Sequence, residues 1–185
     1  MRRNPLYGLW IVALVAVLIG TGIVTAQTGG LNENSVDPVY DEISLSAGFS
    51  PNPLELPAVQ GRRNPNTATH WITTDDEVNV RAQDTGRGCL GYTSTAPTVR
   101  LHWSGSSNWL RISFESSSDT TLIVYDPLHS VWLCNDDDSN NNRNPAITIT
   151  DSSEGLYDIW VASYSRQAAR GGLTITEITE RDLHP

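Results

Sequence analysis

Three consecutive aspartates and a nearby asparagine are the residues whose type and spacing most directly suggest chemistry. Asp136, Asp138 and Asn140 stand at alternating positions, and calcium loops use carboxylate and carbonyl oxygens at alternating positions. Asp137 could replace one of them if the run bends, and two aspartates at neighbouring predicted turns could add oxygens. Calcium is therefore a candidate cofactor, with ligands drawn from Asp119, Asp126, Asp136, Asp137, Asp138 and Asn140.

The same run also has an interpretation without a metal. Asn141 stands where a calcium loop places the glycine of its sharp turn, and Ile147 occupies the position of the distal bidentate glutamate. The alternative is a solvated acidic hairpin loop, in which aspartate side chains cap backbone N–H groups. Both interpretations stay open on the sequence alone.

Three tryptophans are the candidate binding residues. Trp109, Trp132 and Trp160 fall opposite the aliphatic stripe of their predicted strands. If these rings point outward, they could form an aromatic platform for stacking against a sugar or a peptide. The alternative is that both faces of the strands are covered, or that the rings pack singly on turns.

No pattern of catalytic residues stands out. The four histidines, His70, His102, His129 and His184, form no HExxH pair, and the sequence has no GxSxG nucleophile elbow. Nothing singles out one pair of carboxylates for glycoside hydrolysis. We therefore expect a protein that is not an enzyme.

The N-terminal segment predicts export. Arg2 and Arg3 precede an apolar run over residues 6–26, and Val24 and Ala26 are small residues suited to a signal-peptide cleavage site before Gln27. The run is also long enough to be a retained transmembrane anchor. In either case the arginines stay inside and the rest of the chain is secreted or displayed at the cell surface.

Export determines how the two cysteines are interpreted. In an oxidising compartment, two cysteines predict one disulfide, Cys89–Cys134, which closes a loop of 134 − 89 = 45 residues. Such a bond contributes about 3–4 kcal/mol to stability. The competing interpretation, a free nucleophilic thiol, has no histidine-containing motif beside either cysteine to support it.

Alternation of apolar and polar residues predicts strands. Leu110, Ile112 and Phe114 point one way and Arg111 and Ser113 the other, which marks a strand with one buried face. Turn residues separate this strand from the next two, so we expect an antiparallel meander over residues 110–115, 120–125 and 131–134. Further strands are predicted over residues 40–49, 54–59, 70–73, 98–103, 146–150, 155–164 and 173–178, with a charged loop over 75–87.

These short strands predict an all-β fold, an antiparallel β-sandwich. Pro57 places the 54–59 strand at a sheet edge. The expected organisation is a hydrophobic helix over 1–26 (signal peptide or transmembrane anchor), a flexible linker over 27–39, the sandwich over 40–178 and a tail over 179–185. The formal net charge of −9 argues against nucleic acid as a partner.

The order of several motifs resembles a known family. ISLSAGFSPNPLEL, CLGY, DTTLIVYDP, WLCNDDD, GLYDIWVASY and LTITE follow one another as in the bacterial pre-peptidase C-terminal domain. This resemblance covers about residues 40–177. It implies a jelly-roll-like sandwich with a non-catalytic accessory or binding role, in a family whose members include binders of calcium, matrix or polysaccharide.

The sequence therefore predicts a non-catalytic extracytoplasmic binding module. Its expected partner is an extracellular protein or a polysaccharide, and only the N-terminal segment contacts the membrane. One alternative is a purely structural cell-envelope protein. A second is a carbohydrate-binding module that uses exposed tryptophans.

Overall fold

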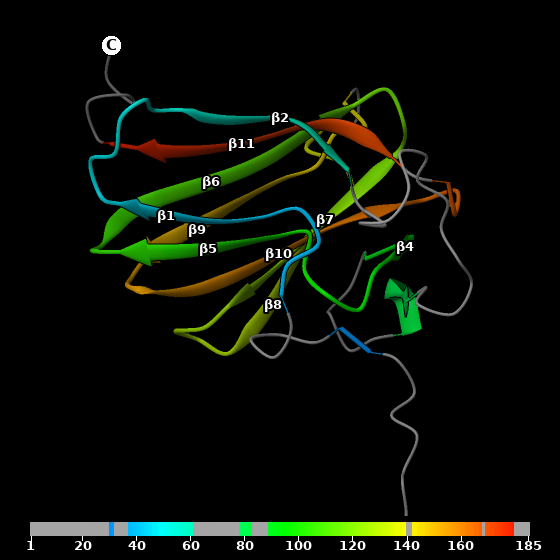
Figure 1. Ribbon diagram of the computed structural model, residues 1–185, viewed down its shortest axis with the longest axis horizontal. Helices are drawn as coiled ribbons and strands as arrows, with labels where there is room; N and C mark the ends of the chain where they lie inside the picture. The colour runs from blue at the N-terminus through cyan, green and yellow to red at the C-terminus, as the bar shows by residue number, and fades with distance from the viewer. Residues whose placement is uncertain are drawn as a thin grey trace, which may run out of the picture.

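The computed structural model describes residues 30–31, 37–60, 78–82, 89–139, 142–167 and 169–179, with the backbone alone for 57–60 and 82. Within these ranges the chain is all-β, with two sheets and no closed barrel (Figure 1). The predicted N-terminal helix and the predicted strand over 70–73 lie outside them, as does nearly all of the predicted tail.

We call the smaller sheet, which has four antiparallel strands, sheet B. Its order is β2–β11–β6–β9, and its strands are β2 (Leu54–Gln60), β6 (Ser107–Ser116), β9 (Ala146–Ser152) and β11 (Arg170–Ile178). The strand that contains Pro57 lies at the edge, as predicted, because proline has no N–H to donate to a second neighbour.

The larger sheet, which we call sheet A, has seven strands. Four of them, β1, β5, β10 and β4, are successive neighbours; β3 follows β4, and β7 pairs with both β10 and β8. The strands are β1 (Asp41–Ser46), β3 (Val78–Asn79), β4 (Tyr92–Thr93), β5 (Val99–Ser104), β7 (Thr120–Asp126), β8 (Val131–Asn135) and β10 (Gly155–Ser163).

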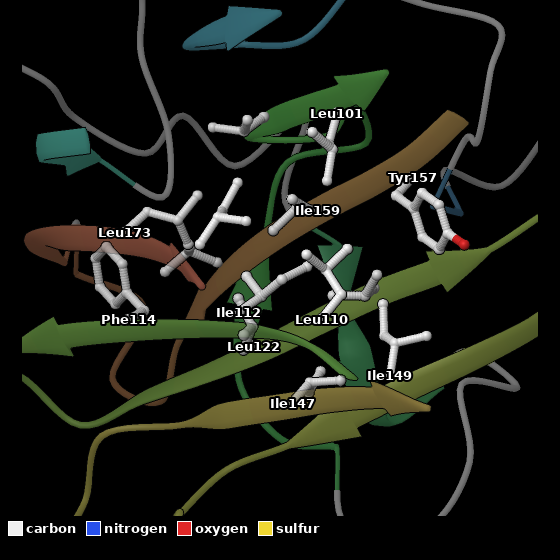
Figure 2. Close-up of a cluster of buried hydrophobic side chains, with 14 of the residues drawn as sticks. Leu101, Leu110, Ile112, Phe114, Leu122, Ile147, Ile149, Tyr157, Ile159 and Leu173 are labelled. Carbon is white, nitrogen blue, oxygen red and sulfur yellow. The ribbon is translucent and has the colours of Figure 1, made fainter. Parts of the chain in front are cut away.

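The two sheets pack face to face over one core (Figure 2). Alternate residues of β6, including Leu110 and Phe114, meet alternate residues of β10, including Tyr157 and Ile159, and all four are fully buried. The Tyr157 hydroxyl donates to the Ser153 carbonyl at 2.8 Å, so this buried polar group is satisfied. The predicted period-two alternation is confirmed.

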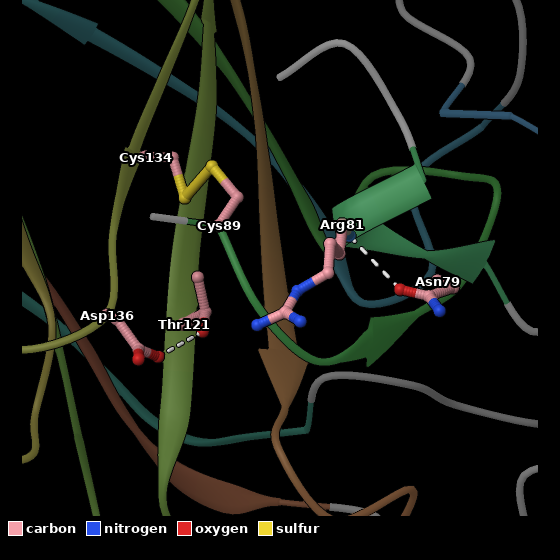
Figure 3. The surroundings of a disulfide bond; sticks show 6 residues. All are labelled: Asn79, Arg81, Cys89, Thr121, Cys134 and Asp136. Carbon is pink, nitrogen blue, oxygen red and sulfur yellow. Dashed lines mark hydrogen bonds between the residues drawn. A yellow bond between two sulfur atoms is a disulfide. The ribbon is translucent and has the colours of Figure 1, made fainter. Parts of the chain in front are cut away.

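A second apolar cluster covers the outer face of sheet A around β7 and β10. Trp160 of β10 and Ile123 of β7 point away from the main core and are nevertheless fully buried. Cys89 and Val80, the latter from the three-residue 3-10 helix η2 (Val80–Ala82), cover them. We call the segments 78–82 and 89–97 the covering layer. The disulfide Cys89–Cys134 joins this layer to β8, with 5.7 Å between the Cα atoms (Figure 3).

The predicted meander is wrong. The β7–β8 hairpin forms, with Ile123 opposite Cys134, but β6 belongs to sheet B and pairs with β9 and β11. The chain crosses between the sheets at the turn after Ser116. Alternation of apolar and polar residues shows which side chains of a strand are buried. It does not show whether the next strand is a hydrogen-bonded neighbour in the same sheet or lies in the opposite sheet, because both have the same alternation.

The prediction of a wholly antiparallel sandwich needs a similar correction. β1 pairs with β5 in parallel, with Ile43 opposite Leu101 and Leu45 opposite Trp103. After β1 the chain passes into sheet B, so β1 is not bound to its sequence neighbour by a hairpin. It can therefore join the edge of sheet A in either direction.

Parts of the predicted linker and of the predicted loop contact the sandwich. Leu31 packs against the apolar cluster around Trp160, and the Val39 N–H donates to the Pro97 carbonyl at 2.7 Å. The predicted loop over 75–87 contains β3 and η2. Within the described ranges, no helix is both long and apolar enough to cross a bilayer.

Candidate functional site

Asp126, one of the predicted calcium ligands, serves the β7–β8 turn. Its Oδ1 accepts the N–H of Leu128 at 2.9 Å, and its Oδ2 lies 2.7 Å from Nδ1 of His129. The side chain is buried, whereas His129 is half-exposed. Both oxygens are therefore engaged in holding the turn, as expected for a capping aspartate.

Asp138 and Asp136 contact different sheets. Both Asp138 oxygens accept from Nη2 of Arg111, on the outer face of sheet B, at 2.9 Å. Asp136 accepts a hydrogen bond from the Thr121 hydroxyl on sheet A (Figure 3). Burial raises the pKa of the Asp136 carboxyl; the Thr121 hydrogen bond opposes the rise, and the charges of Asp119 and Asp137 add to it.

The structure does not bring the six predicted ligands to one point. Asp126 lies at the turn end of the β7–β8 hairpin and Asp136 just beyond its other end. Asp119 and Asp137 remain near Asp136, and Asn140 lies outside the described residues. Among the described residues, no group of three or more histidine, cysteine, aspartate or glutamate side chains is arranged to hold a metal ion.

The three tryptophans do not form one platform. Trp160 is fully buried beneath the covering layer, and its Nε1 donates to the Thr95 carbonyl at 3.3 Å. The half-buried Trp132 packs against it, with 5.2 Å between ring centroids. Trp109 lies on the other sheet and is half-exposed on its outer face. Trp109 is therefore the candidate that remains on an uncovered sheet.

The described histidines each pair with a carboxylate. His129 contacts Asp126, and Nε2 of the half-exposed His102 contacts Glu42 on the neighbouring strand β1. A shallow hollow of about 540 Å³ beside His102 includes Ser44 and Ser104 in its lining. Among the described residues, no serine hydroxyl hydrogen-bonds to this imidazole, so no nucleophile–base pair forms there. His70 and His184 lie outside the described ranges.

The outer face of sheet B has no covering layer among the described residues, whereas that of sheet A is covered around β7 and β10. Cross-strand pairing places the outer side chains of sheet B in rows that run across β9, β6 and β11. We call this surface the open face. It is exposed or half-exposed at Trp109, Arg111, Ser113, Glu115, Thr148, Thr150, Thr174, Thr176 and Ile178.

The rows give the open face an aromatic end and an acidic end. At one end, Trp109 lies between Thr150 and Ile178. Three rows further along the face, Glu115 pairs with Gly172. Gly172 and Ile178 are six residues apart on β11, which corresponds to about 20 Å along an extended strand. The face is thus long enough to contact several units of a polymer.

A hollow of about 410 Å³ lies at the acidic end. Its lining includes the carboxylates Glu55 and Glu115 and the hydroxyls of Ser113 and Thr174. Gly172 also lines it, and a Cβ added at Gly172 would meet nothing within 4 Å. The hollow therefore exists in part because this position has no side chain.

Carboxylates outnumber cations on the open face, because among the described residues Glu55, Glu115 and Asp138 are matched only by Arg111 and the exposed Arg170 at the start of β11. Arg111 is neutralised by Asp138 and also donates to the Thr148 hydroxyl at 3.1 Å. Glu55 and Glu115 are exposed, and neither forms a salt bridge with another described residue. The face therefore suits a neutral or positively charged ligand and repels anions.

Of the predicted binding residues, only Trp109 lies on this face, although the sequence carries a further signal of it. The triplet Thr-Ile-Thr occurs at 148–150 and again at 174–176. In both copies the isoleucine enters the core, which sends the flanking threonines to the outer face.

No family model matches the chain, and neither the curated proteins nor the solved structures contain a match. The resemblance to the pre-peptidase C-terminal domain therefore rests on the order of the motifs.

Proposed function

We propose that the chain is an exported, non-catalytic binding module that holds an extended polysaccharide along the open face of sheet B. The observation that carries this proposal is the difference between the sheets. The covering layer closes the outer face of sheet A around Trp160 of β10, whereas sheet B presents Trp109 and rows of hydroxyl groups. An aromatic ring stacks on the apolar face of a sugar, and hydroxyls exchange hydrogen bonds with its edge.

The charge narrows the class of polysaccharide. Glu55 and Glu115 border the hollow at the acidic end, and Arg111 is already paired. A neutral or amine-bearing polymer fits these groups, because an ammonium can pair with the carboxylates and an anionic polymer is repelled. A structural calcium ion remains a separate hypothesis, for which Asp119, Asp136 and Asp137 are the neighbouring carboxylates.

The predicted export and the family resemblance support the same role. The disulfide Cys89–Cys134 suits an oxidising extracytoplasmic compartment. A jelly-roll-like module of the pre-peptidase C-terminal type, secreted or displayed at the cell surface, would act as an accessory that binds a matrix. The N-terminal segment would then determine whether the module is released or anchored.

Co-sedimentation with insoluble polysaccharides tests the proposal. We expect the purified chain to bind at least one of cellulose, chitin and chitosan, and Trp109→Ala to weaken that binding at least about tenfold. Leu128→Ser is the matched control, because Leu128 is 53% exposed on the β7–β8 turn of the other sheet. Binding to none of these polymers would favour the structural envelope protein, and equal binding by Trp109→Ala would exclude the open face.

A further inference from the structure

A separate hollow of about 300 Å³ lies beside the covering layer, where β3 and β4 meet the end of β10. It is lined by Asn79, Arg81, Leu90, Gly91, Tyr92 and Tyr164. These residues come from segments far apart in the sequence, joined by the pairing of Asn79 with Tyr92 and of Tyr92 with Ser163. The hollow shares no residue with the open face of sheet B.

The described lining of this hollow presents donors and aromatic rings, and none of the six described residues that line it is acidic. Arg81 is exposed, and its guanidinium forms no salt bridge with another described residue. Asn79 Oδ1 accepts the Arg81 backbone N–H at 3.1 Å, which leaves the Asn79 amide nitrogen as a donor (Figure 3). Tyr164 is 55% exposed.

A second arginine, Arg166, packs on a ring that lines the hollow. The Arg166 guanidinium carbon lies 4.3 Å from the centre of the Tyr92 ring, and Nη2 donates to the Tyr92 hydroxyl at 3.2 Å. Arg100 and Arg111, unlike Arg81, are paired with aspartates. In a chain of net charge −9, an exposed arginine in the described lining of a hollow favours an anion.

The backbone around the hollow is fixed. Gly91 has φ +103°, and a Cβ there would lie 2.8 Å from the Ser163 carbonyl oxygen, so only glycine fits this close approach. The Val80 N–H donates to the Gly91 carbonyl at 3.0 Å, and the disulfide begins two residues earlier, at Cys89. A preformed hollow loses little conformational entropy when a ligand binds.

We propose that this hollow binds the carboxylate-bearing ring of an acidic sugar, a uronate at a chain end or branch. Arg81 and the Asn79 amide bind the carboxylate, and Tyr164 stacks on the ring. A guanidinium binds a carboxylate through charge-assisted hydrogen bonds, and the volume, at the small end for ligand sites, suits one sugar unit. This site is independent of the polysaccharide proposed for sheet B.

Calorimetric titration of the full chain with galacturonate oligomers tests the assignment. We expect saturable binding that weakens with added salt and falls at least about tenfold in Arg81→Gln and in Tyr164→Ala, with Tyr164→Phe close to wild type. Arg143→Gln removes the same charge from an exposed position outside the hollow and should bind like wild type. Melting curves of all four variants establish that they are folded.

Several outcomes would overturn the assignment. They are no binding of galacturonate oligomers by the wild type, equal binding of neutral glucose oligomers, or unchanged affinity in Arg81→Gln. A carboxylate can also come from the C-terminus of a peptide, so a peptide with a free C-terminal carboxylate is titrated in parallel. Binding of this peptide without binding of the uronate would contradict the sugar assignment. Gly172→Val, which fills the other hollow, should leave uronate binding unchanged.

Discussion

Arg100 and Asp158 face each other across β5 and β10 and form a bidentate ion pair on the outer face of sheet A. Arg100 Nε and Nη2 donate to the two carboxylate oxygens at 2.7 and 3.1 Å. Both side chains are buried. The hydrogen bond that Arg100 donates to the Asp158 carboxylate is the main cause that raises the pKa of Arg100, and burial opposes it. The pair lies beside the apolar cluster around Trp160, against which the covering layer packs.

Removing one partner of this pair should destabilise the fold strongly. In Asp158→Ala the Arg100 guanidinium stays buried without its carboxylate, and we expect a loss of about 3–5 kcal/mol in the free energy of unfolding. Urea denaturation measures this. Replacing both residues with leucine should recover much of the loss, because two apolar side chains leave no buried charge. A loss below about 1 kcal/mol in Asp158→Ala would show that water reaches the site.

The disulfide should stabilise the covering layer as well as the whole fold. Replacing Cys89 and Cys134 with alanine should lower the free energy of unfolding by about 3–4 kcal/mol, the value for closing a loop of 45 residues. The layer covers Trp160, so tryptophan fluorescence should also shift to longer wavelength under native conditions. An unchanged spectrum and unchanged stability would mean that packing alone holds the layer.

The raised pKa of Asp136 predicts that the effect of replacing this residue on stability depends on pH. A carboxyl whose pKa is raised by folding binds its proton more tightly in the native state, so its contribution to stability falls as the pH rises from the unfolded pKa through the folded pKa. Asp136→Asn keeps an acceptor for Thr121 and removes the charge. Its melting temperature should therefore match wild type near pH 3 and exceed it at pH 7. A constant difference across this range would contradict the assignment.

Calcium addition decides between the two interpretations of the acidic run. Asp126 is engaged by its turn and Asp138 by Arg111, so we expect millimolar calcium to leave the melting temperature within about one degree of its value in chelator. A rise of several degrees that Asp136→Asn abolishes would support a calcium site built from the carboxylates around Asp136.

The sequence was sufficient to identify buried faces and the disulfide. Leu110, Ile112 and Phe114 enter the core, and Cys89 bonds Cys134, as their patterns predicted. Alternation did not reveal which sheet a strand joins, because that depends on contacts between distant segments. For this reason β6 was assigned to the wrong neighbours.

Whether each tryptophan is buried also depends on packing between segments that are distant in the sequence. Trp109 and Trp160 have the same relation to their apolar stripes, yet only Trp160 is covered. The residues that cover it include Leu31, Val80 and Cys89, which are far from it in the chain. Local patterns carry no information about a third layer assembled in this way.

Gly172→Val is the sharpest test of polysaccharide binding on the open face, because it changes that face and little else. The added side chain fills the hollow between Glu55 and Glu115 without meeting any atom at its Cβ, and replacing a strand glycine should stabilise the fold by about 0.5–1 kcal/mol. Affinity for the polysaccharide retained by the wild type is the quantity to measure. If the polysaccharide lies along the open face, Gly172→Val melts at or above the wild-type temperature and binds at least about tenfold more weakly. Unchanged affinity in the folded variant would contradict it.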